Sequence, residues 1–346
     1  MHRRLCRRLS LAIFAGILLT FYRSVQELPR VSLPHASHKR AGVRGKAPAV
    51  TVLIWWYPFG KKTEIKDCDT LYNIKGCRLT TNRQLYPISQ AVVVHHRDLG
   101  GNVSQLPAER RPAFQRWVWM NFESPTHSSG LEELNGVFNW TMSYKRGSDI
   151  FIPYGYLYPK KREGRKVVLP IKSKLVAWVI SNWNEDHARV KYYHRLSKHV
   201  VIDVYGRYHQ ELQNNSIVLT ISPYKFYLAF ENSQHVDYIT EKLWRNALMS
   251  NTVPIVLGPS RANYEQYIPA DSFIHVNDFS TPKKLAEHLM FLDENARSYR
   301  KFFDWKRRYN VHLAKFWEEH YCKVCKAVKS ARADYKIISN LANWFQ

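Results

Sequence analysis

The chain has 346 residues, of which 45% are hydrophobic and 14% aromatic, so it can bury a large core and is long enough for two domains. This composition excludes a wholly disordered chain. The formal net charge is +24, and residues 1–47 contribute +9 of it because they hold ten Lys and Arg against the single acid Glu27, which leaves +15 for the remainder. An excess of this size indicates an anionic partner: a nucleic acid, an anionic membrane or a phosphorylated small substrate.

The N-terminus carries an uncharged, mostly apolar segment at residues 9–22, which four arginines precede. This segment rises only about 21 Å as a helix, short of the ~30 Å hydrocarbon core, so a cleaved signal peptide is the alternative to a membrane anchor. No small-residue cleavage site follows it, and the positive-inside rule places the N-terminus in the cytosol. We expect a cytoplasmic tail (1–8), a type II signal anchor (9–22) and a flexible stem (23–47), with the remaining chain in a secretory lumen.

Three N-glycosylation sequons agree with a lumenal location, although chance alone yields one or two in a chain of this length. They begin at Asn102, Asn139 and Asn214. We therefore expect N-linked glycans at these three positions.

Four of the five cysteines form two pairs that are close in sequence, Cys68 with Cys77 and Cys322 with Cys325, and Cys6 belongs to the anchor region. An even set in an oxidising compartment indicates two disulfides. A zinc site is the alternative, but the first pair is spaced too widely for the usual ligand pattern.

Short apolar runs rich in β-branched and aromatic residues follow the stem, at 50–56, 91–95 and 117–122, and are typical of buried strands. After Pro170 strands and helices alternate. Strands are expected at 175–180, 200–204, 225–230 and 253–257, and helices at 185–197 and 238–249. This alternation indicates parallel sheets with helices on both faces. We expect an α/β protein with two Rossmann-like domains, 48–165 and 166–300, and a cleft between them.

Polar residues are dense where these apolar runs end, and ligands of open α/β sheets bind beyond the carboxyl ends of the strands. Glu123 follows the third run, where a lone acid is ordinarily a solvated loop residue. Arg189 lies near the start of the first expected helix, where its plain interpretation is an i,i+4 partner of Glu185. Lys242 lies near a helix N-terminus, a good position for a diphosphate, although ordinary capping explains it equally well.

Two short patterns resemble metal sites, and we assign no metal to either. His95 and His96 are adjacent on a strand and face opposite ways, so they are poor joint ligands. Asp67 and Asp69 form an Asp-x-Asp pattern that surrounds a cysteine expected in a disulfide.

Taken together, the stretches resemble the animal α1,3-fucosyltransferases of glycosyltransferase family ten along nearly all of residues 50–346. The matching segments are WYPFG (56–60), HHRD (95–98), ESPTH (123–127), SNWNEDHARVKYY (181–193) and FENSQHVDYITEK (230–242). The resemblance implies a Golgi membrane enzyme of the GT-B architecture that uses GDP-fucose with inversion. It also implies N-acetyllactosamine-terminated glycans of glycoproteins or glycolipids as acceptors, no cofactor and no obligatory metal. A secretory anchor argues against a nucleic-acid partner, and a homodimer stays open.

The resemblance assigns roles by position. Glu123 matches the general base, and Arg189 and Lys242 match contacts to the donor diphosphate. Further donor-site positions are Asn232, Tyr238, Glu241, Ser181 and Asn182. His96 and Arg97 match the acceptor side, and an arginine at position 97 is typical of members that make α1,3 linkages on type 2 chains, as in Lewis x.

The cysteines match the family's two pairs, for which we expect Cys68 with Cys322 and Cys77 with Cys325. This pairing ties a C-terminal tail, 301–346, back to the first domain, and local pairing is the alternative. Two rival functions are a family member that fucosylates protein hydroxyls and a glycan-binding relative without activity.

Overall fold

The computed structural model describes residues 49–164, 167–332 and 335–346. The expected cytoplasmic tail, anchor and stem lie outside these residues. Within them, no helix has the length and apolar character needed to cross a membrane.

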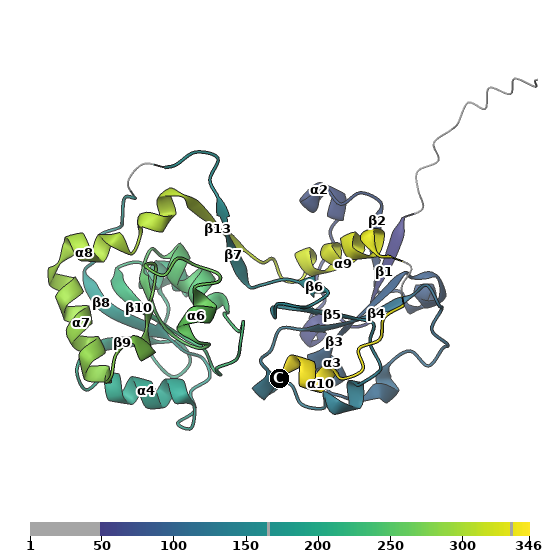
Figure 1. Ribbon diagram of the computed structural model, residues 1–346, viewed down its shortest axis with the longest axis horizontal. Coiled ribbons are helices and arrows are strands. Elements are labelled where there is room, and N and C mark those ends of the chain that lie inside the picture. The colour runs from purple at the N-terminus through teal and green to yellow at the C-terminus, as the bar shows by residue number, and fades with distance from the viewer. Residues whose placement is uncertain (1–48, 165–166, 333–334) are drawn as a thin grey trace, which may run out of the picture. The chain divides into compact units, whose positions relative to one another are not determined.

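The described chain contains two parallel sheets, which confirms the α/β prediction (Figure 1). The first sheet has the strand order β2-β1-β3-β4-β5-β6. Its strands are β1 (Val50–Ile54), β2 (Cys77–Thr80), β3 (Ala91–His95), β4 (Arg116–Asn121), β5 (Trp140–Ser143) and β6 (Ile150–Phe151). The central strands β3 and β4 are buried along their whole length, as expected for parallel strands covered on both faces.

The second sheet has the order β12-β11-β10-β8-β9, again with parallel pairing throughout. Its strands are β8 (Lys174–Val179), β9 (Ile202–Tyr205), β10 (Tyr224–Phe230), β11 (Val253–Leu257) and β12 (Ile274–His275). A separate antiparallel ribbon joins β7 (Gly155–Pro159) to β13 (Tyr309–Leu313).

Helices cover both faces of the second sheet, because alternate residues of each strand point to opposite sides. On one face Phe226 and Leu228 pack against α4, α7 and α8. On the other face Tyr227 and Ala229 pack against α5, α6 and a π-helix, η7. These helices are α4 (Ala188–Leu196), α5 (Ile217–Ile221), α6 (Arg261–Tyr264), η7 (Lys242–Leu248), α7 (Pro282–Glu294) and α8 (Ala296–Lys301).

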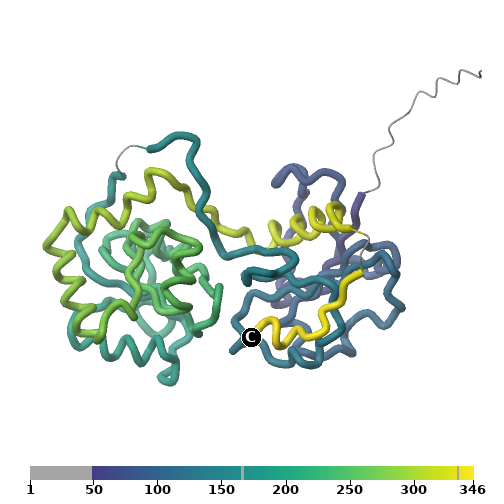
Figure 2. The backbone as a smooth tube through the Cα atoms, viewed as in Figure 1, coloured from purple at the N-terminus to yellow at the C-terminus, as the bar shows by residue number. Residues whose placement is uncertain are grey.

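The C-terminal part of the chain packs on the first sheet (Figure 2). Helix α9 (Glu318–Ser330) lies against β1, β2 and β3, and buries Tyr321 and Val324 there. Helix α10 (Leu341–Phe345) buries Leu341 and Phe345 in the same core. The remaining helices are α2 (Cys68–Tyr72) and α3 (His96–Leu99). Short 3-10 turns complete the described chain: η1 (Pro58–Gly60), η2 (Arg83–Ile88), η3 (Val103–Gln105), η4 (Pro125–His127), η5 (Glu132–Leu134), η6 (Gln213–Asn215), η8 (Val276–Asp278) and η9 (Asp304–Arg307).

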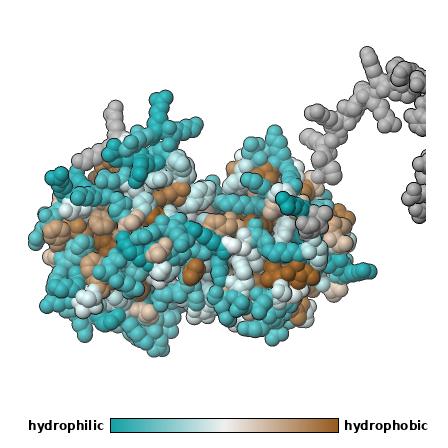
Figure 3. Space-filling view, viewed as in Figure 1, coloured by the Kyte–Doolittle hydropathy of each residue, from teal (hydrophilic) through white to brown (hydrophobic). Residues whose placement is uncertain are grey.

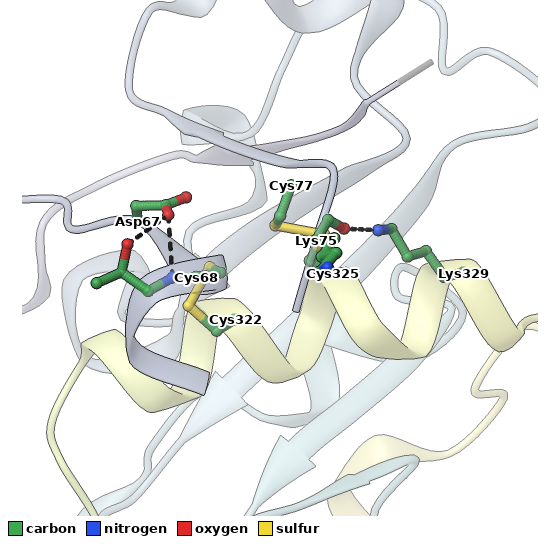
Figure 4. Close-up of a disulfide and its surroundings, with 8 residues drawn as sticks. Asp67, Cys68, Lys75, Cys77, Cys322, Cys325 and Lys329 are labelled. Carbon is green, nitrogen blue, oxygen red and sulfur yellow. Dashed lines mark hydrogen bonds between the residues drawn. A yellow bond between two sulfur atoms is a disulfide. The ribbon is translucent and has the colours of Figure 1, made fainter. Parts of the chain in front are cut away.

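Two disulfides fasten α9 to the first domain, one to α2 and one to β2 (Figure 4). They join Cys68 to Cys322 and Cys77 to Cys325, as expected from the family resemblance. Asp67 caps α2, since its carboxylate accepts hydrogen bonds from the Thr70 backbone N–H and hydroxyl, both at 3.0 Å. Asp67, one of the two acids of the Asp-x-Asp pattern, therefore has a structural role as a helix cap.

On the face shown in Figure 3 most surface residues are hydrophilic, and hydrophobic residues occur singly or in small groups. Such scattered apolar exposure is normal for a folded domain.

Candidate active site

Glu123 lies two residues beyond the carboxyl end of β4 and is half-buried. Its backbone N–H donates to the Asn121 side-chain oxygen at 3.1 Å, and the Asn121 amide donates to Ser128 Oγ at 2.7 Å. The strand end therefore holds the loop that carries this carboxylate.

Two tyrosines, the buried Tyr144 and the half-buried Tyr154, hold the same loop from the other side. Tyr154 donates to the Phe122 carbonyl at 2.5 Å, and Tyr144 donates to the Glu123 carbonyl at 3.2 Å. Burial raises the pKa of both phenols, so they stay protonated and can donate. The backbone on either side of the Phe122–Glu123 bond is thus fixed by side chains far away in sequence.

The Phe122 ring packs against His320 of α9, with ring centres 4.5 Å apart. His320 is fully buried, and neither of its ring nitrogens has a hydrogen-bond partner among the described residues. Burial lowers the pKa of His320 to about 3, so the ring is neutral. In this environment His320 acts as a packing residue behind the Glu123 loop.

Beyond the carboxyl end of β10 lies a buried charge cluster. Glu231 is fully buried, and it accepts hydrogen bonds from the Thr240 backbone N–H and hydroxyl. Lys242 Nζ lies 3.0 Å from Glu231 Oε2 and 3.2 Å from Glu241 Oε1, and it also donates to Thr240 Oγ1 at 2.8 Å. All three protons of the Lys242 ammonium are therefore used.

The charges of this cluster follow from competition between burial and pairing. Burial favours a lower pKa for Lys242, but the carboxylates of Glu231 and Glu241 outweigh it and raise the pKa above 10.5. Burial raises the pKa of Glu231 despite the nearby cation. Burial also acts to raise the pKa of Glu241, but Lys242 and local hydrogen bonds lower it overall.

Arg189 is buried on α4, and its Nη2 donates to the Asn182 carbonyl at 2.6 Å. Its Nε has no partner among the described residues, which leaves a donor available. Burial lowers the pKa of Arg189, and Glu231 is the principal opposing influence. Arg189 therefore lies close enough to the Glu231–Lys242 cluster to interact with it electrostatically.

The expected pairing of Arg189 with Glu185 does not occur. The helix begins at Ala188 rather than at 185, and Glu185 instead accepts from the Trp183 indole at 2.8 Å and pairs with His194 at 2.9 Å. Arg189 consequently faces the protein interior. Ser181 and Asn182 lie in the exposed loop before this helix.

Direct contacts join the Glu123 loop, and also the loop after β5, to the segment that precedes Lys242. Thr126 Oγ1 lies 2.6 Å from His235 Nε2, and the Arg146 backbone N–H donates to Asp237 Oδ2 at 2.8 Å. The buried Tyr238 ring lies 5.2 Å from the Tyr144 ring. The structure thus gathers Glu123, Arg189, Lys242, Glu241 and Tyr238 around connected segments, with the half-buried Asn232 after β10.

The two expected acceptor-side residues differ in their exposure to solvent. His96 is buried, its Nδ1 accepts from the Trp119 indole at 3.3 Å, and burial lowers its pKa to about 4. A buried ring that is already hydrogen-bonded is poorly placed to contact a glycan, so the expectation for His96 does not fit this structure. Arg97 is exposed.

The three sequons also differ. Asn102 and Asn214 are exposed, whereas Asn139 is fully buried. Asn139 Oδ1 accepts from the Trp117 backbone N–H at 2.7 Å, and its Nδ2 donates to the Lys336 carbonyl at 2.8 Å. A glycan on Asn139 does not fit this packed arrangement, which corrects the expectation for that site.

Sequence reasoning missed Glu231, Tyr144, Tyr154 and Asp237. Glu231 had a usable signal, because it is an acid that directly follows a buried strand, much as Glu123 lies two residues after β4. The tyrosines had none, since their partners are backbone carbonyls 21 and 32 residues away.

Comparisons with known proteins agree over most of the described chain. Residues 47–155 match the family "Fucosyltransferase, N-terminal", and residues 169–344 match "Glycosyltransferase family 10 (fucosyltransferase) C-term". The chain is 50% identical over 296 residues to mouse 4-galactosyl-N-acetylglucosaminide 3-alpha-L-fucosyltransferase 9, covering 85% of this chain and 82% of that protein.

The chain is also 48% identical over 341 residues to human alpha-(1,3)-fucosyltransferase 4, which covers 86% of this chain but only 64% of that relative's length. A crystal structure of an alpha1,3-fucosyltransferase with GDP shares the fold, with a TM-score of 0.54 at 17% identity, and covers 86% of this chain and 94% of that one. A second such structure, with GDP-fucose, gives a TM-score of 0.51 at 18% identity, and covers 84% of this chain and 94% of that one. The chain therefore belongs to glycosyltransferase family 10, the fucosyltransferases.

Proposed function

We propose that the protein is an inverting α1,3-fucosyltransferase of the GT-B architecture that moves fucose from GDP-fucose to the 3-hydroxyl of N-acetylglucosamine in N-acetyllactosamine. One observation carries the proposal: Thr126 of the Glu123 loop contacts His235, in the segment that precedes Lys242, in a chain about half identical to a relative named as a 3-alpha-L-fucosyltransferase. The solved relatives with GDP and GDP-fucose support this donor. We further propose that the enzyme resides in the Golgi membrane, anchored through residues 9–22.

In the proposed reaction Glu123 removes the proton of the acceptor 3-hydroxyl while that oxygen attacks C1 of fucose. The C1–oxygen bond to the diphosphate breaks, and its electron pair leaves with GDP. A single displacement of this kind inverts the anomeric centre. General-base help is needed because the hydroxyl is a weak nucleophile, and cations are needed because negative charge grows on the leaving diphosphate.

The contacts favour Arg189 as the first cation for the diphosphate, because it keeps a free Nε donor in the described structure. Lys242 is fully engaged, so it can bind the donor only if one of its three partners releases it. Glu241 is the partner best suited to do so, since its side chain is 40% exposed whereas Glu231 is fully buried. Tyr238, Asn232, Ser181 and Asn182 complete the proposed donor site, and Arg97 faces the acceptor.

Replacing Arg189 with Ala is expected to weaken GDP affinity by about 10- to 150-fold, the equivalent of one charge-assisted contact of about 1.5–3 kcal/mol. The measurement is calorimetric titration with GDP. Lys191→Ala is the matched control, because it removes a cation from the same helix. Lys191 is exposed, and its ammonium pairs with the exposed Asp186 at 3.8 Å. Equal affinities for the two folded variants would remove Arg189 from the diphosphate site.

Transfer is expected to continue in excess EDTA, because Arg189 and Lys242 can compensate the diphosphate charge. The described residues contain no group of three or more His, Cys, Asp or Glu side chains arranged to hold a metal ion. Initial rates measured with EDTA and with added Mn²⁺ test this prediction. A strict requirement for Mn²⁺ would contradict it.

The acceptor assignment is tested by incubating the protein and GDP-fucose with three acceptors: N-acetyllactosamine, its type 1 isomer and a folded protein without glycans. We expect N-acetyllactosamine to react best, because an arginine at position 97 is typical of the family members that act on type 2 chains. Preferential labelling of the protein acceptor would support polypeptide fucosylation instead. Donor binding without transfer to any of the three would indicate a glycan-binding relative without activity.

A further inference from the structure

A cavity of about 490 Å³ lies beside α9, apart from the proposed donor and acceptor residues. We call it the basic pocket. Its walls come from the loop after α2, from the β7–β13 ribbon and from α9. Its lining includes Tyr72, Lys75, Tyr156, Lys323, Lys326 and Lys329. Its volume falls within the range of small-ligand sites.

The charge of the basic pocket is unbalanced. Its lining carries four lysines and one acid, Glu319. Glu319 is buried and already paired with Lys323 at 2.8 Å and with His312 at 2.9 Å. Within the described ranges, Lys75, Lys326 and Lys329 have no carboxylate partner, although Lys329 donates to the Lys75 carbonyl (Figure 4). A concave surface with this excess attracts an anion.

Aromatic and hydroxyl groups accompany the lysines. The Tyr156 ring is 38% exposed and is held by stacking on His312, with ring centres 4.5 Å apart and planes inclined by 28°. The Tyr72 hydroxyl has no hydrogen-bond partner in the part of the chain that the structure describes. A rigid exposed ring offers a stacking surface for the C–H face of a sugar. An inorganic ion has no such face and would make no stacking contact with the ring.

The shape and charge of the pocket also argue against two other occupants. Residues 1–47 carry a large excess of Lys and Arg, so this segment of the chain is repelled by the lysines. A bilayer surface is flat and cannot enter a cavity to meet Tyr156. An acidic saccharide meets all three requirements of the pocket: it carries an anion, it has a face that can stack on Tyr156, and it is small enough to enter.

We propose that the basic pocket is a second saccharide-binding site that takes the carboxylate or sulfate of an acidic glycan. The lining residues carry this proposal, and it does not depend on the transfer reaction. The site lies along the helix that contacts the Glu123 loop: His320 packs on Phe122, and Lys329 is nine residues further, about 14 Å along a helix. A glycan bound here is near enough to belong to the same glycoconjugate as an acceptor.

The test is calorimetric titration of the protein with a sulfated hexasaccharide prepared from heparin, in saturating GDP so that the proposed donor site is filled. We expect Lys75→Ala/Lys326→Ala to weaken binding at least about tenfold, since charge-assisted contacts are lost. The matched control is Lys198→Ala/Lys283→Ala, which removes two exposed lysines elsewhere and should stay within about twofold. Thermal unfolding confirms that each variant is folded.

A third variant, Tyr156→Leu, separates a saccharide from a simple anion. It should weaken the hexasaccharide several-fold and leave the weak binding of inorganic sulfate unchanged. Three results would overturn the proposal: equal losses in the two lysine double variants, unchanged binding in Lys75→Ala/Lys326→Ala, or no effect of Tyr156→Leu on the hexasaccharide. Lysine-dependent binding of phosphatidylserine vesicles without saccharide binding would also overturn it.

Discussion

Replacing Glu123 with Gln is expected to lower the turnover of fucose transfer by about 10²–10⁴-fold, the usual contribution of a general base. Glutamine keeps the shape of the side chain but cannot accept the acceptor proton. The loop should keep its position, because Tyr144, Tyr154 and Asn121 hold its backbone rather than its carboxylate. GDP affinity should therefore change little.

The measurement is the transfer rate at saturating GDP-fucose, together with GDP affinity for the folded variant. Glu132→Gln is the control, since Glu132 is an exposed acid nine residues further along the same domain. Turnover within a few-fold of the unaltered protein would exclude Glu123 as the base. A collapse of GDP affinity would instead move Glu123 to the donor site.

Replacing Glu231 with Ala is expected to lower the free energy of unfolding by about 3–5 kcal/mol, the typical cost of removing one partner from a buried ion pair. Glu231 is fully buried and accepts from both Thr240 and Lys242, so its loss leaves the hydroxyl and the ammonium without their principal acceptor. Lys242 should also shift, and GDP affinity should fall with it. Urea unfolding at constant m-value gives the change in stability.

Glu241→Ala provides a matched comparison, because Glu241 pairs with the same ammonium but is partly exposed. Its loss should cost only about 0–1 kcal/mol of stability, as for an exposed ion pair. If Glu231→Ala and Glu241→Ala destabilise the protein equally, burial does not set the strength of this cluster.

The parallel sheets could be predicted from sequence because their evidence is local. Apolar runs of strand length alternate with amphipathic segments, and the predicted strand at 225–230 corresponds to β10 (Tyr224–Phe230). Element ends were less predictable. The helix expected at 185–197 begins only at Ala188, because Asn184 accepts a hydrogen bond from the Asp186 backbone N–H and forms a turn instead.

Other features depend on contacts distant in sequence, which no local pattern records. The segment expected to form a helix at 238–249 contains a π-helix, η7, next to the buried Glu231–Lys242 pair. The burial of Asn139 depends on Lys336, almost 200 residues later. The anchoring of the Glu123 loop by Tyr144 and Tyr154 is invisible in sequence for the same reason.

The central claim is tested most directly by determining the structure of the reaction product. The protein would be incubated with GDP-fucose and N-acetyllactosamine, and the purified trisaccharide analysed by NMR for its linkage position and anomeric configuration. We predict one α-linked fucose on O3 of N-acetylglucosamine. Fucose on another hydroxyl, a β linkage, or hydrolysis of GDP-fucose without any trisaccharide would contradict it.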